Sequence, residues 1–309
     1  MSDPIPAAWP APFGAAERSH RAALPRTVPH RAAARSPGSA PVIGLALGGG
    51  AAFGAAHVGV LAALEDMGVQ IDVVVGTSAG ALIGAGYAAG LPVSVIDKII
   101  RSAVWRDFGR VTVPRKLGVL DPEVLERTIA RFAEDRDIEA LPRRFAAVAT
   151  DLRTLAPYLL DTGPVPTALL ATIAVPGLFP PVRAGEALLI DGAFSSNVPT
   201  WGARLLGADR VITVRLTPER TMRPMALLRQ AMGGFDDEVP DVLIMPDTTK
   251  FSRWKAAGVP ALIAAGREAT EAVADEIRAL AGIAGPSTTE PTAPERAGAD
   301  STAAGPPSA

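Results

Sequence analysis

The chain has 309 residues, 48% of them hydrophobic, which is enough for one large or two modest folded domains. Its 30 basic and 32 acidic side chains give a net charge of −2, so no basic excess favours nucleic acid or another polyanion as a partner. It contains no cysteine, which excludes disulfides, thiol catalysis and cysteine-ligated metals.

The two ends of the chain differ in composition from its middle. Residues 1–40 are rich in Ala, Pro and Arg and contain no continuous apolar segment of the kind that marks a secretory signal. Residues 284–309 are dominated by small and polar residues that bury too little apolar surface to offset chain entropy. We therefore expect two disordered tails around one ordered domain, residues 41–283. No apolar run is long enough to span a bilayer, so the expected location is cytoplasmic, with membrane contact only peripheral.

Strands and helices are expected to alternate along this domain. The helical patterns cover residues 55–67, 81–89, 92–104, 125–132, 167–174 and 259–283. Short apolar runs typical of buried strands cover residues 42–47, 71–75, 145–150, 158–160, 188–190, 211–214 and 242–245. This alternation predicts a single α/β domain with a mainly parallel central sheet and helices on both faces.

The first expected strand runs into a glycine-rich loop, Gly48 to Gly54. A dinucleotide fingerprint would need an acidic residue at the end of the next strand, where Ser78 follows instead, and no lysine follows the glycines as in a P-loop. An oxyanion hole needs consecutive small residues whose backbone N–H groups point into one cavity, as Gly49, Gly50 and Ala51 can provide. We prefer the oxyanion hole to the nucleotide site.

The second expected strand ends in Gly76-Thr77-Ser78-Ala79-Gly80. In this G-x-S-x-G spacing, glycines two positions before and after the serine leave room for a strained turn that projects its Oγ from the strand end. The helix that follows favours developing negative charge at its N-terminus. Ser78 is therefore the candidate nucleophile, and a tight turn that holds a serine without a catalytic role is the alternative.

The histidines are badly placed to act as the base for this serine. His20 and His30 lie in the N-terminal tail, and His57 lies on the helix behind the glycine loop. None follows Ser78, which excludes the order serine, acid, histidine found in α/β-hydrolases. We interpret His57 as a packing or capping residue. A carboxylate must then accept the serine proton directly.

Asp191 is the best-placed carboxylate. It follows an expected strand, and the carboxyl ends of parallel strands are where α/β proteins build their sites. Gly192 and Ala193 follow it and leave room for a close approach. We interpret the alternatives, Asp151 and Asp161, as turn-forming or positioning groups.

Together, these three ordered motifs resemble the patatin-like phospholipase family, in particular its small bacterial members. Further matching segments are Ala149 to Leu152, Ala174 to Pro181 and Asn197 to Pro199, so the resemblance covers nearly all of residues 41–283. It implies a three-layer patatin-like domain with a Ser-Asp dyad, Ser78 as nucleophile and Asp191 as proton acceptor. It also implies cleavage of fatty-acyl esters through an acyl-serine, without metal or other cofactor.

Two positions of the glycine loop depart from the family pattern. Ala51 stands where another glycine is usual; it still supplies a backbone donor, with less freedom in φ. Phe53 stands where Arg or Lys is usual, and it offers an apolar acyl-binding surface in place of a cation. The expected function is a lipid acyl hydrolase of the phospholipase A, lysophospholipase or carboxylesterase type. A catalytically weak lipid-binding or regulatory protein is the alternative.

The expected partners follow from this function. They are a lipid or acyl-ester substrate and, peripherally, a membrane surface; no nucleic acid is expected. The segment 222–232 carries apolar residues with basic edges, which predicts either docking on a bilayer or packing of a helix on the domain.

Overall fold

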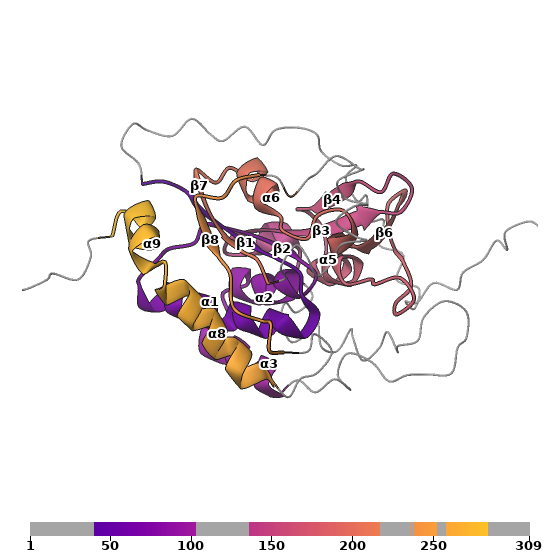
Figure 1. Cartoon of the computed structure of the whole chain (residues 1–309). Helices are drawn as coiled ribbons and strands as arrows, with labels where there is room; N and C mark the ends of the chain where they lie inside the picture. The colour runs from indigo at the N-terminus through magenta and orange to yellow at the C-terminus, as the bar shows by residue number, and fades with distance from the viewer. Residues whose placement is uncertain (1–39, 103–135, 217–235, 237, 252–257, 284–309) are drawn as a thin grey trace, which may run out of the picture.

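A computed structural model describes residues 40–102, 136–216, 236, 238–251 and 258–283 (Figure 1). The expected tails, apart from Ala40, lie outside the described residues, as do the helical pattern at 125–132 and the apolar stretch at 222–232. Within the described part of the chain, no helix combines the length and the apolarity needed to cross a bilayer.

One eight-stranded sheet runs through the described residues in the order β5-β6-β3-β2-β1-β7-β8, and β4 pairs with β3 outside this path. The strands are β1 (Ile43–Leu47), β2 (Val73–Thr77), β3 (Arg144–Asp151), β4 (Pro157–Leu160), β5 (Val182–Ala184), β6 (Ala187–Asp191), β7 (Arg210–Val214) and β8 (Val242–Ile244). The run from β3 through β2, β1 and β7 to β8 is parallel. β4 and β6 are antiparallel to β3, and β5 is antiparallel to β6. The mainly parallel sheet is thereby confirmed.

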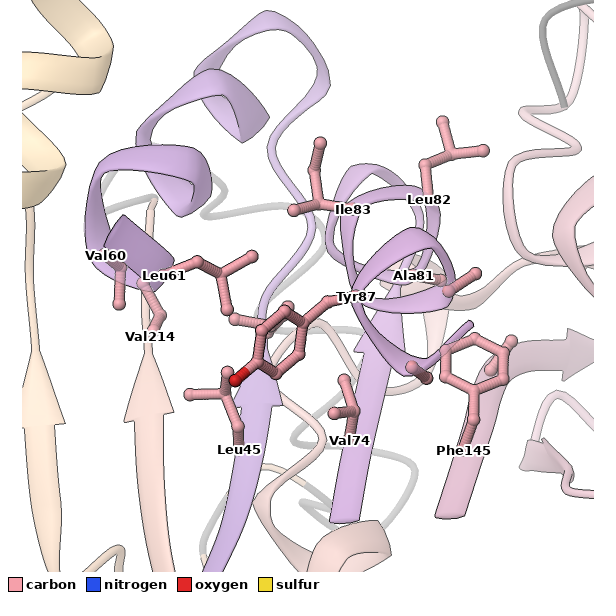
Figure 2. Packing of buried hydrophobic residues seen from close by; sticks show 14 of the residues in the cluster. Leu45, Val60, Leu61, Val74, Ala81, Leu82, Ile83, Tyr87, Phe145 and Val214 are labelled. Carbon is pink, nitrogen blue, oxygen red and sulfur yellow. The ribbon is translucent and has the colours of Figure 1, made fainter. Parts of the chain in front are cut away.

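The described helices cover both faces of this sheet, which confirms the three layers (Figure 1). They are α1 (Ala55–Asp66), α2 (Ala79–Ala88), α3 (Val93–Ser102), α5 (Val165–Thr172), α6 (Thr200–Leu205), α8 (Val259–Glu271) and α9 (Ala274–Ala281). The larger apolar cluster joins one face to α1, α2, α3, α5, α8 and α9, whereas a smaller cluster joins the other face to α6. Figure 2 shows Leu45, Val74 and Phe145 of three strands in the larger cluster, together with Leu61 and Tyr87 of α1 and α2.

The parallel pairing of β1 and β2 decides where the two sequence motifs meet. Their register places Leu47 beside Gly76, so both strands end at the same edge of the sheet. All residues of both strands are buried, as expected for runs rich in β-branched and aliphatic side chains at the centre of a parallel sheet. The glycine loop that follows β1 and the serine turn that follows β2 therefore lie side by side.

Several details differ from the expected elements. β2 begins and ends two residues later than expected, because Gly76 and Thr77 still pair with β3. The strand β5 and the short helix α6 were not expected from the sequence. The helical pattern at 259–283 is divided into α8 and α9, since the backbone tightens at Val273, whose N–H donates to the Thr270 carbonyl three residues earlier.

Two glycines allow α1 and α8 to touch backbone to backbone. A Cβ atom added at Gly59 would lie 1.8 Å from the Ile263 carbonyl oxygen. A Cβ atom added at Gly266 would lie 1.9 Å from the Ala56 carbonyl oxygen. Since α1 begins directly after the glycine loop, this contact braces the element that leads out of the loop.

Candidate active site

Ser78 lies in a sharp turn between β2 and α2, with φ 52° and ψ −120°. A non-glycine residue rarely adopts such angles, so the backbone is strained at this position. The neighbouring glycines make the turn sterically feasible. A Cβ atom at Gly76 would lie 2.4 Å from the Ala81 backbone, and one at Gly80 would lie 2.1 Å from the Leu47 carbonyl oxygen. The steric explanation of the G-x-S-x-G spacing is confirmed.

The Ser78 hydroxyl points at Asp191. Ser78 Oγ donates a hydrogen bond to Asp191 Oδ2 at 2.9 Å, and the Ala193 N–H donates to Oδ1 at 2.8 Å. Asp191 is only 3% exposed. Asp151, by contrast, accepts the Arg153 N–H within its own turn, as its turn-forming interpretation predicts. The structure thus brings together the two residues that the sequence singles out as nucleophile and proton acceptor.

The strand that carries Asp191 differs in direction from the expected one. Its strand, β6, runs antiparallel to β3, so Asp191 does not lie at the carboxyl end of a parallel strand. β3 is longer than β2: Val148 pairs with Thr77, and the next residue pairs with Asp191. The end of β6 therefore arrives beside the end of β2. A Cβ atom at Gly192 would lie 2.0 Å from the Val148 carbonyl oxygen, so this glycine permits the chain to pass close to β3.

The surroundings of Asp191 suit a proton acceptor. Burial raises the pKa of its carboxyl from 3.8 to about 6, and the hydrogen bonds from the Ala193 N–H and from Ser78 oppose this rise in the pKa. A general base works best when its pKa lies near the working pH. Asp191 is therefore ionised at neutral pH, yet binds a proton more readily than an exposed aspartate.

Two threonines to which the sequence assigns no role form hydrogen bonds with the backbone of Ser78 and Asp191. The Ser78 N–H donates to Thr172 Oγ1 at 2.8 Å, and the Thr172 hydroxyl donates in turn to the Val148 carbonyl. Thr150 Oγ1 donates to the Asp191 carbonyl at 2.9 Å. Thr150 lies in the matching segment Ala149 to Leu152, but no local pattern indicates these hydrogen bonds, because each bond joins segments that are distant in the chain.

The glycine loop differs from the expected oxyanion hole at one position. The Gly49 N–H donates to the Asn197 carbonyl at 3.0 Å, so this donor is already occupied and Gly49 drops out of the expected donor set. Among the described residues, no group accepts a hydrogen bond from the Gly50 or Ala51 N–H. Ala51 is exposed and has φ 52°, the left-handed conformation for which glycine is better suited. A Cβ atom at Gly54 would lie 2.6 Å from the Ala79 Cβ, so the loop packs against the start of α2.

The sequence model of the family described as patatin-like phospholipase matches residues 45–204, just over half of the 309 residues. The chain belongs to the patatin-like phospholipase family. The matched part of this patatin-like chain runs from β1 into α6 and includes the glycine loop, Ser78 and Asp191. The resemblance drawn from the three motifs is confirmed.

Curated relatives contain this patatin-like region within longer proteins. An uncharacterized NTE family protein of Mycobacterium tuberculosis is 35% identical over 219 residues, which covers 64% of this chain and 36% of the relative. A patatin-like phospholipase domain-containing protein of Caenorhabditis elegans is 37% identical over 180 residues, covering 55% of this chain and 13% of the relative. The lysophospholipase nte1 of Aspergillus fumigatus is 30% identical over 234 residues, covering 73% of this chain and 14% of the relative. The chain spans little more than a third of these relatives at most.

Two solved structures share a looser likeness. VipD from Legionella pneumophila has a TM-score of 0.48 at 12% identity, over 78% of this chain and 67% of that chain. The type III effector protein ExoU has a TM-score of 0.40 at 15% identity, over 78% of this chain and 53% of that chain. Neither likeness bears on the chemistry of the site.

Phe53, which replaces the usual cation of the family, lies elsewhere than expected. Its side chain is 6% exposed and belongs to the larger apolar cluster. It therefore does not widen an acyl-binding surface, contrary to the expectation from the sequence. An aromatic ring is stabilised more by burial in the core than by lining a solvent-exposed loop. Leu178, Phe179 and Phe194 are only partly buried.

His57 supports the glycine loop from α1. It is fully buried, and its Nε2–H donates to the Gly48 carbonyl oxygen at 2.8 Å, whereas Nδ1 has no hydrogen-bonding partner among the described residues. Burial lowers the pKa of the imidazole to about 4, and the bond to Gly48 opposes this effect. The ring is therefore neutral at pH 7. This supports the packing and capping role that the sequence predicts.

We expect His57 to make the fold sensitive to acid. Because its pKa falls from 6.5 to about 4 on folding, the unfolded chain takes up the proton first as the pH drops. The contribution of neutral His57 to the free energy of unfolding is complete above pH 6.5 and is lost by about pH 4. The total loss is about 3 kcal/mol. In His57→Gln the side-chain amide keeps a donor for Gly48 but does not titrate, so its unfolding midpoint in urea falls less on acidification. The control is His30→Gln, in the segment for which the sequence predicts a disordered tail, and it should behave as wild type. Equal acid sensitivity of all three proteins would contradict this role.

Proposed function

We propose that this chain is a serine lipid acyl hydrolase in which Ser78 and Asp191 form the catalytic dyad. The observation that carries the proposal is the 2.9 Å hydrogen bond from Ser78 Oγ to the buried Asp191 carboxylate. Membership of the patatin-like phospholipase family supports fatty-acyl esters of phospholipids, lysophospholipids or neutral lipids as substrates. The relative from Aspergillus fumigatus that is named a lysophospholipase agrees with this substrate class.

The first half of the proposed reaction transfers the acyl group to the serine. Asp191 Oδ2 takes the hydroxyl proton while Ser78 Oγ attacks the ester carbonyl carbon. The negative charge that develops on the carbonyl oxygen is stabilised by the N–H groups of Gly50 and Ala51 and by the N-terminus of α2; an oxyanion donor of this kind contributes about 3 kcal/mol. The tetrahedral intermediate collapses, the bond to the alcohol breaks, and Asp191 returns the proton to the leaving alcohol oxygen.

The second half releases the fatty acid. Asp191 accepts a proton from a water molecule as the water oxygen attacks the acyl-serine carbonyl carbon. The same backbone donors stabilise the second oxyanion. When the bond to Ser78 breaks, its Oγ takes the proton back from Asp191 and the dyad is restored.

A second candidate function, a catalytically weak lipid-binding protein, is favoured by the buried Phe53 in place of the usual cation of the family. The two functions differ in one measurable property. An activated serine reacts covalently with a fluorophosphonate, whereas a serine in a binding protein does not.

Fluorophosphonate labelling of the purified chain therefore tests the proposal. We expect one label per chain, located on Ser78 by peptide mass spectrometry, and none in Ser78→Ala. Ser102→Ala is the matched control, because Ser102 is exposed and its hydroxyl donates to the Ile99 carbonyl of its own helix, α3. A folded wild-type protein that remains unlabelled would overturn the hydrolase proposal in favour of lipid binding.

A further inference from the structure

A turn that follows Asp191, residues 195–198, contacts the end of β2 beside the proposed nucleophile. The Thr77 hydroxyl, one residue before Ser78, donates to the Ser196 carbonyl at 3.0 Å. Ser195 Oγ shares a 2.8 Å hydrogen bond with Thr150 Oγ1. These are buried bonds between segments far apart in the sequence, so a shift of this turn is transmitted to the backbone beside the nucleophile.

The same turn also holds the glycine loop. The Asn197 carbonyl accepts the Gly49 N–H at 3.0 Å, one residue before the proposed donors Gly50 and Ala51. A Cβ atom at Gly49 would lie 2.7 Å from Asn197 Oδ1 and 3.4 Å from Ser78 Cβ, so loop, turn and nucleophile are packed without slack. The position of Asn197 therefore decides where the N–H groups of the loop lie relative to Ser78 Oγ.

One carboxylate organises this turn. Asp236 Oδ1 accepts hydrogen bonds from Ser196 Oγ at 2.8 Å and from the Val198 N–H at 3.2 Å, and Oδ2 accepts the Asn197 N–H at 3.0 Å. Three consecutive residues thus donate to a single side chain. Because one side chain accepts all three bonds, it holds the three donors at fixed positions relative to one another and so defines the shape of the turn.

An indole completes the arrangement. Trp201 Nε1 on α6 donates to Ser196 Oγ at 2.9 Å, which leaves the Ser196 hydroxyl proton for Asp236. The hydrogen bonds form a series from Trp201 on α6 through Ser196 in the turn to Asp236. Asp236 lies 38 residues after Val198 in the sequence. This indole therefore reports directly on the hydrogen bonding of the turn.

We propose that Asp236 is a positioning residue for acyl transfer: by holding residues Ser196 to Val198 it sets the place of the oxyanion donors relative to Ser78. The inference rests on the proposed function. It assigns Asp236 no contact with the substrate; the carboxylate acts through Asn197 and the glycine loop. Its loss should therefore lower kcat more than it raises KM, because the donors matter most when the oxyanion forms.

The decisive variant is Asp236→Asn, whose amide group presents N–H to at least one of the three donors. We expect kcat for a short-chain ester to fall by about 10- to 100-fold and KM to change by less than about twofold, since small displacements of reacting groups have effects of this size. The rate of fluorophosphonate labelling should fall in parallel. In nuclear magnetic resonance spectra, the indole N–H signal of Trp201, identified with Trp201→Phe, should shift while the other signals keep their dispersion.

Asp241→Asn is the matched control. The Asp241 carboxylate also collects three donors, the Val211 N–H, Arg204 and Arg210, but at the start of β7, away from the site. It should retain wild-type kcat. If Asp236→Asn does not fold, Ser196→Ala replaces it, since it removes one donor only; its kcat should fall about three- to tenfold.

The outcomes separate the two proposals. A folded Asp236→Asn, or failing that a folded Ser196→Ala, with wild-type kcat would overturn the positioning role of Asp236 and leave the hydrolase proposal standing. A folded wild-type protein that neither hydrolyses esters nor reacts with the fluorophosphonate would overturn the hydrolase proposal itself. Equal losses of kcat in Asp236→Asn and Asp241→Asn would assign the effect to general stability and would also overturn the positioning role.

Discussion

Replacing Asp191 by asparagine is expected to lower kcat for ester hydrolysis by about 10²- to 10⁴-fold, the range attributed to a general base. The asparagine can still accept the Ala193 N–H and can bond to Ser78 Oγ, so the geometry of the turn is preserved. It cannot take up a proton from the serine or from water. For the wild-type protein, the proposed function predicts that kcat/KM rises as Asp191 ionises, through a pKa of about 6.

The control for this variant is Asp151→Asn, in which the side chain can still accept the Arg153 N–H of its own turn. It should hydrolyse esters at the wild-type rate. If Asp191→Asn keeps more than about a tenth of the wild-type kcat, the loss falls below the range for a general base and another group must accept the proton.

Asp191→Asn should also change the pH dependence of stability. The pKa of Asp191 is raised on folding from 3.8 to about 6, so its favourable contribution is complete below pH 3.8 and is lost as the pH rises through about 6. The loss amounts to about 3 kcal/mol in the wild type and is absent from the variant. Urea unfolding at about pH 8 should therefore show Asp191→Asn as the more stable protein, which is the cost of keeping a buried base ionised.

The largest loss of stability is expected from Gly266→Ala. In an exposed helix this change stabilises by about 1 kcal/mol, but here the new Cβ would lie 1.9 Å from the Ala56 carbonyl oxygen. Helix α8 must then move away from α1, and overpacking of this kind costs about 1 to 3 kcal/mol. We expect a lower unfolding midpoint in urea with an unchanged slope. Ala264→Ser, exposed on the same helix, should change stability by less than about 0.5 kcal/mol. A stabilised Gly266→Ala would show that the two helices are not held at this distance.

Local sequence determined the strands that carry the motifs. The apolar runs of β1 and β2 are long enough to predict buried parallel strands, and the glycines around Ser78 follow from the steric needs of one turn. Because no histidine is suitably placed, the sequence indicates a carboxylate as the proton acceptor. These conclusions need only residue types and short spacings, because strand propensity, turn sterics and the chemistry of a side chain act within a few residues.

The short strand β5 could not be predicted from local sequence patterns. Val182–Ala184 is three residues long and becomes a strand only because β6 offers it an antiparallel partner. The direction of β6 is likewise invisible in its own sequence, since an apolar strand has the same pattern in either direction. The place of Asp191 beside Ser78 depends on the greater length of β3.

The fold class, the strained serine turn and the candidate roles of Ser78 and Asp191 follow from residue types and short spacings. Tertiary structure alone decided that the Gly49 N–H is used by Asn197, that Phe53 is buried in the core, and that Asp236 holds the turn beside the site. The reason is physical. A hydrogen-bond donor can be assigned only when its acceptor is in place, and these acceptors and packing partners come from segments brought together by folding.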